Sequence, residues 1–537
     1  MKTLGISGKH RHAAAAIAVD GRVVAATAEE CLARVPAIGY SSTGAPLHAV
    51  AASLAVAGLD GADIDEVIVV DDDVAQSVDN NRSDEVFDAL TAAVPRARTR
   101  RASAIEADAL QASAAAPEHA AVLVCSAEPA AFVSFRRDGG VLKPTARLAG
   151  ADRLVCAART FARALGMKSA DAFADLDRPA AADPEYTDLI RDALAWSDAH
   201  GITVDVARIN DTIETVRARA EGDLADAQSQ NVRVDEARRA LAASVRTRVA
   251  QVVHEAARHV ALRDSVESIA LGGSLFANAQ LNTELRRLFD GMATVAQVPE
   301  APGRSLGAAL SAHREPGRID SVSIGPAFSD SDIKRTLDNC RLDYVYEPDW
   351  RRVIERTSRL LSQGKVVAWF QGPMAFGPRP LGSRSILCDP SLRYARENMN
   401  EYLRQVPLAE PLPVAFAPTV AAQLSTAGAT PFATYDAAVT STMRDRLRSA
   451  LNGPQHVRIN GGMSTVGAEL RDLLEHHYAR TNVPALIETP LCASGEPAAC
   501  TPRDAVRTVY SAAIDALIIG RFVLMKDYWL LRTDADV

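Results

Sequence analysis

Two arginines and a lysine fall within one short stretch of this chain. Residues 364–387 read GKVVAWFQGPMAFGPRPLGSRSIL, a buried strand at 366–370 followed by a loop of Gly and Pro that carries Arg379 and Arg384. Arginine offers a planar fork of donors and Lys365 a point charge, so the three cations suit a phosphate or carboxylate ligand. We predict catalytic roles for Lys365, Arg379 and Arg384. The alternative is an ordinary surface loop with solvated charges.

A pair of glycines forms a second candidate ligand site. Gly272 and Gly273 follow an apolar run at 268–271. Glycine lets the backbone approach a phosphate or sugar closely, and a helix start after it supplies free N–H groups. The pattern suits a bound phosphate or sugar, but a glycine pair alone is weak evidence for a ligand.

The elements that must position these residues follow an α/β pattern. Strand-like apolar runs lie at 3–7, 13–19, 22–28 and 66–70. Asp20-Gly21 is a strong two-residue turn, which predicts a hairpin, and a helix is indicated at 46–57. Residues 151–262 are mostly helical in pattern, and apolar residues at near-helical spacing predict a packed helix over 234–262.

Length and composition are those of a globular enzyme. A chain of 537 residues should form more than one domain, and 48% hydrophobic with 23% charged residues is ordinary. The net charge of -8 argues against a general nucleic-acid binder. There is no apolar run of about 18 residues and no signal-peptide pattern, so we expect a cytoplasmic protein with no membrane partner. Seven scattered cysteines without a CxxC pair indicate neither a disulfide framework nor a zinc ribbon.

Residues 376–387 closely resemble the FGPRALGNRSIL signature of the NodU/CmcH carbamoyltransferase family. Pro380 replaces the Ala of that signature and Ser383 the Asn. The opening at 4–16 resembles the LGI-N-x-x-HGDASAA box of the family, and 272–282 resembles its GGVALNCVLN box. The boxes keep their order along nearly the whole chain.

This resemblance implies the fold and the domain division. We expect an N-terminal actin/Hsp70-like domain, a duplicated ribonuclease H-like α/β fold, at 1–323. A YrdC-like α/β domain is expected at 324–537. In the family, the C-terminal domain condenses carbamoyl phosphate with ATP into a carbamoyl adenylate, and the N-terminal domain passes the carbamoyl group to a hydroxyl.

The resemblance also assigns residues. His10 aligns with the opening His, which would act as a base or hydrogen-bond partner at the acceptor hydroxyl. Asn278 joins the two glycines as a cofactor-binding residue. Ser385 in the signature and Thr489 in the box that corresponds to NTSFN-x-x-GEP complete the cofactor-binding set. The implied cofactors are ATP and Mg²⁺ with the nucleotide.

The metal box of the family is altered. Its HHxAHAASA segment falls at 106–114, where Ala107 and Leu110 replace two histidines, and the aspartate of its GDAG box falls at Ala301. Without imidazoles and carboxylate, the position should not hold the iron of the family. We predict no metal ligand here, although Glu106 and Asp108 leave a carboxylate contact to magnesium conceivable.

The phosphate pocket of the C-terminal domain is altered too. Glu488 replaces the Asn of the family, and an anion there would repel carbamoyl phosphate unless a cation such as Arg458 compensates it.

Three functions are therefore open. The first is an ATP-dependent carbamoyltransferase of natural-product biosynthesis, with carbamoyl phosphate and a small-molecule acceptor as partners. The second is a diverged, metal-independent ATP-dependent ligase or condensing enzyme on the same scaffold. The third is a non-catalytic partner of an active homologue, and a homodimer or a heteromer with a homologue is conceivable.

Overall fold

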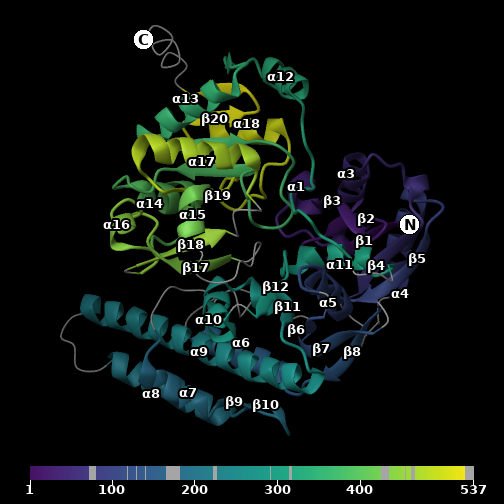
Figure 1. Cartoon of the computed structure of the whole chain (residues 1–537), viewed down its shortest axis with the longest axis vertical. Coiled ribbons are helices and arrows are strands. Elements are labelled where there is room, and N and C mark those ends of the chain that lie inside the picture. Colours follow the sequence, from purple (N-terminus) through teal and green to yellow (C-terminus); the bar gives the residue numbers. More distant parts are fainter. Residues whose placement is uncertain are drawn as a thin grey trace.

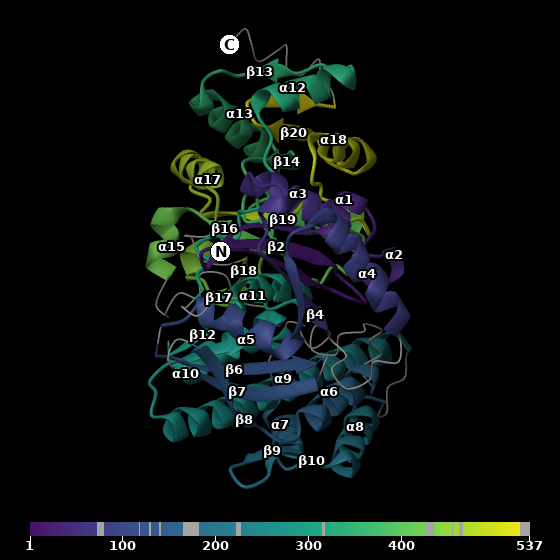
Figure 2. The same ribbon diagram turned by 90° about the vertical axis from the view of Figure 1, so that its right-hand side faces the viewer.

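In the described residues, the strands form two five-stranded sheets, one nine-stranded sheet and a two-stranded hairpin. The computed structural model describes residues 1–71, 80–117, 119–127, 130–138, 141–164, 182–221, 227–290, 292–313, 317–424, 434–453, 455–460 and 466–526. Figure 1 shows the C-terminal part at upper left, the first sheet in purple at the right and the second sheet below. In Figure 2 the first sheet overlaps the lower strands of the C-terminal part, and the second sheet lies below both.

The first sheet has the strand order β3-β2-β1-β4-β5. Its strands are β1 Lys2–Ser7, β2 Ala14–Val19, β3 Arg22–Ala28, β4 Glu66–Asp71 and β5 Arg98–Ser103. The predicted hairpin is confirmed, because Asp20 and Gly21 both have positive φ, 47° and 78°, as a tight two-residue turn requires. The three strands β1 to β3 pair antiparallel, whereas β4 and β5 join β1 in parallel.

The second sheet repeats this arrangement. Its strands are β6 Ala121–Ala127, β7 Ala130–Asp138, β8 Val141–Arg147, β11 Ile269–Gly272 and β12 Ala293–Val295. They run in the order β8-β7-β6-β11-β12, with an antiparallel β6–β7–β8 meander and β11 and β12 parallel to β6. The same order and senses in both sheets confirm the predicted duplicated, actin/Hsp70-like α/β fold.

Helices cover both sheets and fill the connection between β8 and β11. The helices of this part are α1 Glu29–Ala33, α2 Tyr40–Thr43, α3 Leu47–Ala57, α4 Asn80–Ala93, α5 Ala104–Ala114, α6 Ala151–Ala164, α7 Pro184–Arg191, α8 Val206–Glu221, α9 Ala227–Asp264, α10 Ala279–Phe289 and α11 Arg304–Leu310. The predicted helix over 234–262 lies within α9. The segment predicted to be mostly helical also contains a hairpin, β9 Leu194–Ser197 with β10 Gly201–Val204. Within the described residues, no helix combines the length and apolar character that crossing a membrane requires.

The nine-stranded sheet belongs to the C-terminal part. Its strand order is β13-β21-β20-β14-β15-β19-β16-β18-β17. The strands are β13 Val345–Tyr346, β14 Val367–Phe370, β15 Arg384–Cys388, β16 Pro413–Phe416, β17 Thr434–Ala438, β18 His456–Asn460, β19 Ala485–Pro490, β20 Ala516–Ile519 and β21 Phe522–Met525. The helices are α12 Asp330–Asn339, α13 Trp350–Ser362, α14 Ala395–Glu397, α15 Pro418–Leu424, α16 Ser441–Arg444, α17 Ala468–Thr481 and α18 Pro502–Ser511. β14 is central, parallel to β20 and antiparallel to β15. The domain boundary at 323/324 stays a prediction.

Candidate functional site

The loop that carries the two arginines connects β14 with β15. Arg384, the first residue of β15, is only 1% exposed and lies over the Phe370 ring at 3.6 Å. Its guanidinium donates to four carbonyl oxygens, those of Gln371, Gly372, Ser383 and Pro326. Burial lowers the pKa of Arg384 to about 9, because these partners are neutral. Arg384 therefore holds the two ends of the loop together from inside.

Arg379 joins this loop to the N-terminal part. Its guanidinium donates to both carboxylate oxygens of Glu300, at 2.9 and 3.3 Å, and to the Gln297 carbonyl oxygen at 2.9 Å. The loop residues Phe376 and Leu381 are buried in the same apolar cluster as strands β2 and β3 and helix α11. The signature loop is thus an interface element between the two parts of the chain.

The predicted cluster of three cations does not form. Lys365 lies before the amino end of β14 and pairs with Asp515, at 3.4 Å between Nζ and Oδ1. The arginine-bearing loop begins at the opposite end of β14, so the strand lies between Lys365 and the loop. Sequence proximity was misleading because an extended strand carries its ends apart by about 3.3 Å per residue.

Glu488, Ser385 and Thr489 lie behind the loop on two adjacent strands. The Glu488 carboxylate accepts from the Gly382 N–H at 2.6 Å and from the Ser385 hydroxyl at 2.7 Å, and it is fully buried. Burial raises the pKa of Glu488, and the two hydrogen bonds only partly offset it. Thr489 is also buried, and its Oγ1 has no hydrogen-bond partner among the described residues. Ser385 thus donates to the carboxylate that also binds the loop backbone at Gly382. Its predicted cofactor contact stays a prediction.

The suggested compensation of Glu488 by Arg458 is wrong. Arg458 on β18 donates to Asp436 on β17, at 3.0 Å between Nε and Oδ1, and both side chains are buried. Arg458 and Asp436 lie directly opposite each other on these neighbouring strands, a pairing that the sequence pattern alone did not reveal.

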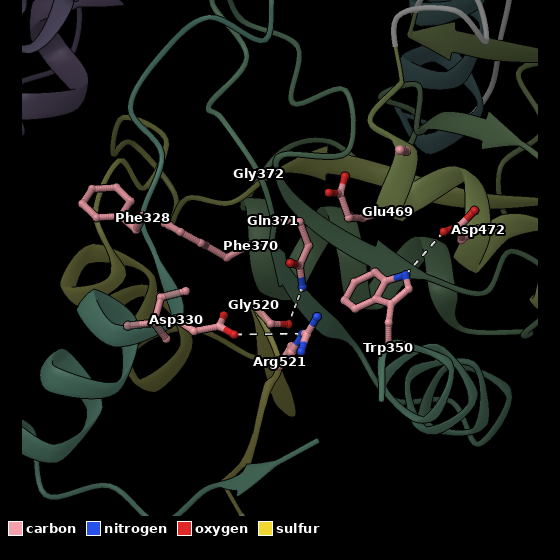
Figure 3. Close-up of a pocket in the computed structure, with 12 residues that line it drawn as sticks. Phe328, Asp330, Trp350, Phe370, Gln371, Gly372, Glu469, Asp472, Gly520 and Arg521 are labelled. Carbon is pink, nitrogen blue, oxygen red and sulfur yellow. Dashed lines mark hydrogen bonds and ion pairs between the residues drawn. The ribbon is translucent and has the colours of Figure 1, made fainter. Parts of the chain in front are cut away.

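A cavity opens where β14 and β20 end. Its volume is about 380 Å³. The lining residues are Phe328, Asp330, Ile333, Trp350, Phe370, Gln371, Gly372, Ala468, Glu469, Asp472, Gly520 and Arg521. Figure 3 shows Trp350 and Phe328 on opposite sides of this space, with Glu469 near Gly372. The carboxyl ends of parallel strands are where open α/β sheets commonly bind ligands.

The cavity combines aromatic walls with an excess of acid. Asp330, Glu469 and Asp472 bring three carboxylates against the one guanidinium of Arg521, which lies 4.0 Å from Asp330. The Trp350 indole N–H donates to Asp472 at 3.4 Å. The sequence motifs did not single out these residues. The helix-capping pattern before Trp350 and the position of Gly520 directly after an apolar strand were the available signals.

The predicted glycine site has a packing explanation. A Cβ on Gly272 would lie 2.7 Å from the Asp108 carbonyl oxygen, and one on Gly273 would lie 2.4 Å from the Cys125 carbonyl oxygen. Gly273 also has a φ of +99°, which favours glycine. Asn278 caps α10 by accepting from the Leu281 N–H at 2.8 Å. The close approach that the glycines permit is between protein segments, and their cofactor role stays a prediction.

The altered metal box contains an ion pair. Asp108 on α5 accepts from Arg304 Nε at 3.2 and 3.3 Å, and Arg304 Nη2 donates to Ser126 Oγ at 2.9 Å. Ala107 and Leu110 on α5 carry no donor atom, and neither does Ala301. No group of three or more His, Cys, Asp or Glu side chains within the described ranges could hold a metal ion. The residues present do not fit the imidazole-rich iron site of the family.

His10 lies in the loop between β1 and β2 and is exposed. The backbone of this loop packs against Gly39, whose Cβ would lie 2.3 Å from the His10 carbonyl oxygen. Exposure leaves the imidazole accessible to a ligand, and its role as base stays a prediction.

Comparison with known proteins shows similarity to carbamoyltransferases. The sequence model described as "Carbamoyltransferase C-terminus" matches residues 358–526. An uncharacterized protein of Synechocystis sp. is 28% identical over 387 residues, 64% of this chain and 62% of the relative. Nodulation protein NolNO of Sinorhizobium fredii is 26% identical over 53% of this chain and 44% of its own. The 3'-hydroxymethylcephem-O-carbamoyltransferase of Amycolatopsis lactamdurans is 27% identical over 34% of this chain and 33% of its own length. The alignments thus span less than two thirds of each relative.

Solved structures are similar only at a low level. The activator of 2-hydroxyisocaproyl-CoA dehydratase from Clostridium difficile, with bound ADPNP, is 15% identical with a TM-score of 0.31, over 58% of this chain and 93% of its own. The ROK hexokinase from Thermus thermophilus is 16% identical with a TM-score of 0.33, over 58% and 98%. The match of residues 358–526 and the named relatives support a similarity of this chain to the NodU/CmcH-type carbamoyltransferases, at low identity.

Proposed function

We propose that this protein is an ATP-dependent carbamoyltransferase that modifies a small-molecule hydroxyl in natural-product biosynthesis. The observation that carries the proposal is the match of residues 358–526 to the carbamoyltransferase C-terminus, which includes the whole signature loop. Water cleaves carbamoyl phosphate to carbamate and inorganic phosphate, and a carbamate oxygen then attacks the α-phosphorus of ATP and displaces pyrophosphate. The resulting carbamoyl adenylate releases AMP when the acceptor oxygen takes the carbamoyl group.

The nucleotide site in this proposal is the cavity at the ends of β14 and β20. The arginines and lysine predicted to bind phosphate are engaged elsewhere, as described above. The aromatic side chains Trp350 and Phe328 face the cavity from two sides and suit a purine ring, since flat rings stack favourably. The site also lies at the beginning of the signature loop, at Gln371 and Gly372.

The acidic lining supports a nucleotide that arrives with magnesium. Bare triphosphate would be repelled by Asp330, Glu469 and Asp472. Magnesium prefers one or two carboxylates together with substrate phosphates, and its charge offsets that of the phosphates. Glu469, in the first turn of α17, and Asp472, three residues later on the same helix, are the residues that would hold it. We therefore expect binding of ATP to depend strongly on Mg²⁺.

The measurement is release of phosphate and pyrophosphate from carbamoyl phosphate and ATP, with and without Mg²⁺ and with a panel of hydroxylated acceptors. Trp350→Ala should weaken ATP binding about tenfold through lost stacking. The matched control is Tyr402→Ala, an aromatic residue that is 68% exposed. Equal effects of the two substitutions would exclude the cavity as the nucleotide site.

A second candidate is a diverged, metal-independent ligase on the same scaffold. The buried Arg304–Asp108 pair and the buried Glu488 favour it, because both depart from the residues that the family uses. Pyrophosphate release with a carboxylic acid substrate, but not with carbamoyl phosphate, would support this candidate. No release with any donor would instead support a non-catalytic partner.

A further inference from the structure

The Arg304–Asp108 pair lies at the junction of the two halves of the N-terminal part. Asp108 comes from α5, which follows the first sheet, and Arg304 comes from α11, which follows the last strand of the second sheet. Ser126 near the end of β6 completes the group. The Asp108 and Arg304 side chains are 2% and 7% exposed, so both charges are withdrawn from water.

The backbone around the pair is packed tightly. A Cβ on Gly307 of α11 would lie 1.9 Å from the Ala107 carbonyl oxygen of α5, and Gly272 meets the Asp108 carbonyl in the same way. Helices that touch backbone to backbone have little freedom to separate. The guanidinium is therefore fixed relative to both sheets, as a bound metal ion would be.

We propose that the Arg304 guanidinium takes the place of the metal of the family and supplies its positive charge permanently. Three facts support this: the aligned positions Ala107, Leu110 and Ala301 offer no ligand atom, the remaining carboxylate already faces a cation, and the pair is buried. Arg304 is a positioning residue that holds a fixed guanidinium beside Asp108 at the junction. The consequence for catalysis rests on the proposed function, whereas the consequence for metal binding does not.

The first test uses metal content and stability. The full chain, purified without chelator, should contain no stoichiometric iron, and added Fe²⁺ or Mn²⁺ should not change its melting temperature. Arg304→Ala should melt at a lower temperature, because it leaves Asp108 buried and unpaired. Millimolar guanidinium or Mn²⁺ should restore part of that loss, because each can reoccupy a cation position beside Asp108.

The matched control is Arg458→Ala, which breaks an equally buried pair with Asp436 on another sheet. It should be destabilised without rescue by Mn²⁺. Arg304→Met combined with Asp108→Leu removes both charges and should recover most of the stability. Stoichiometric iron in the wild-type chain that is lost in Asp108→Asn would overturn the proposal, and so would Mn²⁺ rescue of the control alone.

The second test separates the two half-reactions. Arg304→Met should lower transfer to the acceptor by about 100-fold through loss of fixed charge, and Arg304→Lys should lower it less. Pyrophosphate release by the C-terminal domain should change by less than about twofold. Equal transfer rates in wild type and Arg304→Met would refute the catalytic role. If the wild-type protein releases no pyrophosphate, the proposed function is wrong. The metal-content and melting experiments would still test whether Arg304 replaces the metal.

Discussion

Removal of the Arg379 side chain should loosen the contact between the two parts of the chain. Arg379 makes two hydrogen bonds to Glu300 and one to the Gln297 carbonyl, and its side chain is 9% exposed. Arg379→Ala removes all three hydrogen bonds and leaves the Glu300 carboxylate and the Gln297 carbonyl without this donor.

The size of the effect follows from these contacts. A hydrogen bond to a charged group contributes about 1.5 to 3 kcal/mol, and the lower value applies here because Glu300 is 22% exposed and partly screened. The unsatisfied Gln297 carbonyl adds about 1 kcal/mol. The expected loss is therefore about 2.5 to 3 kcal/mol, or roughly 5 to 12 °C in the melting temperature of a domain of this size.

Scanning calorimetry should detect this loss, with limited proteolysis as a second measurement of the interface. A chain with several domains does not unfold in two states, so the shift is expected in one transition rather than in all. Arg335→Ala is the matched control, because Arg335 pairs with Asp332 at the surface and its side chain is 72% exposed. Its effect should stay below about 0.5 kcal/mol.

One result would refute the reasoning. If Arg379→Ala shifts the transition no more than Arg335→Ala, the interface contact is energetically unimportant, and Arg379 is available to a ligand as the sequence predicted. Titration with carbamoyl phosphate would then show binding to wild type and loss of binding in Arg379→Ala.

Three further predictions concern buried groups. Glu488→Gln should raise stability at pH 7, because the raised pKa of Glu488 shows that the fold favours its neutral form. The ionised carboxylate destabilises the fold increasingly as pH rises above the ordinary Glu pKa. Thermal melts from pH 4 to 7 should therefore show a stability gain of Glu488→Gln that grows with pH. Burial raises the pKa of Asp389, but hydrogen bonds from His477 and Ser391 outweigh burial and lower the pKa. The ionised Asp389 therefore stabilises the fold, and this stabilisation should be lost as pH falls below the ordinary Asp pKa. Thermal melts at acid pH should show a smaller loss of stability in Asp389→Asn than in the wild type. Gly273→Ala should cost more than about 2 kcal/mol by clash with the Cys125 carbonyl, measured by denaturant unfolding, whereas Gly453→Ala has comparable backbone strain in open space and should cost less.

Local patterns predicted the opening hairpin and the helix after it because the causes of these elements are local. Asp20-Gly21 specifies its turn through positive φ at adjacent residues, and the predicted helix at 46–57 is α3 at Leu47–Ala57. The family signature could be recognised for a similar reason, because its residues are contiguous in the sequence.

The burial of His477 shows where reasoning from local patterns fails. His477 is 1% exposed and lies 3.3 Å from the buried Asp389, measured between Nε2 and Oδ2. The polar identity of a histidine suggested exposure, whereas a partner 88 positions earlier in the chain makes its burial possible.

The sequence by itself determined the first hairpin, the helices at 46–57 and 234–262, the α/β class and the family resemblance, because each depends on neighbouring residues or ordered motifs. Only the tertiary structure decided which charge meets which. Arg379 meets Glu300 across 79 residues, and Arg304 meets Asp108 across 196. Whether a cation awaits a ligand or neutralises a carboxylate depends on its distance from that carboxylate, and the fold sets this distance through contacts that no local pattern encodes.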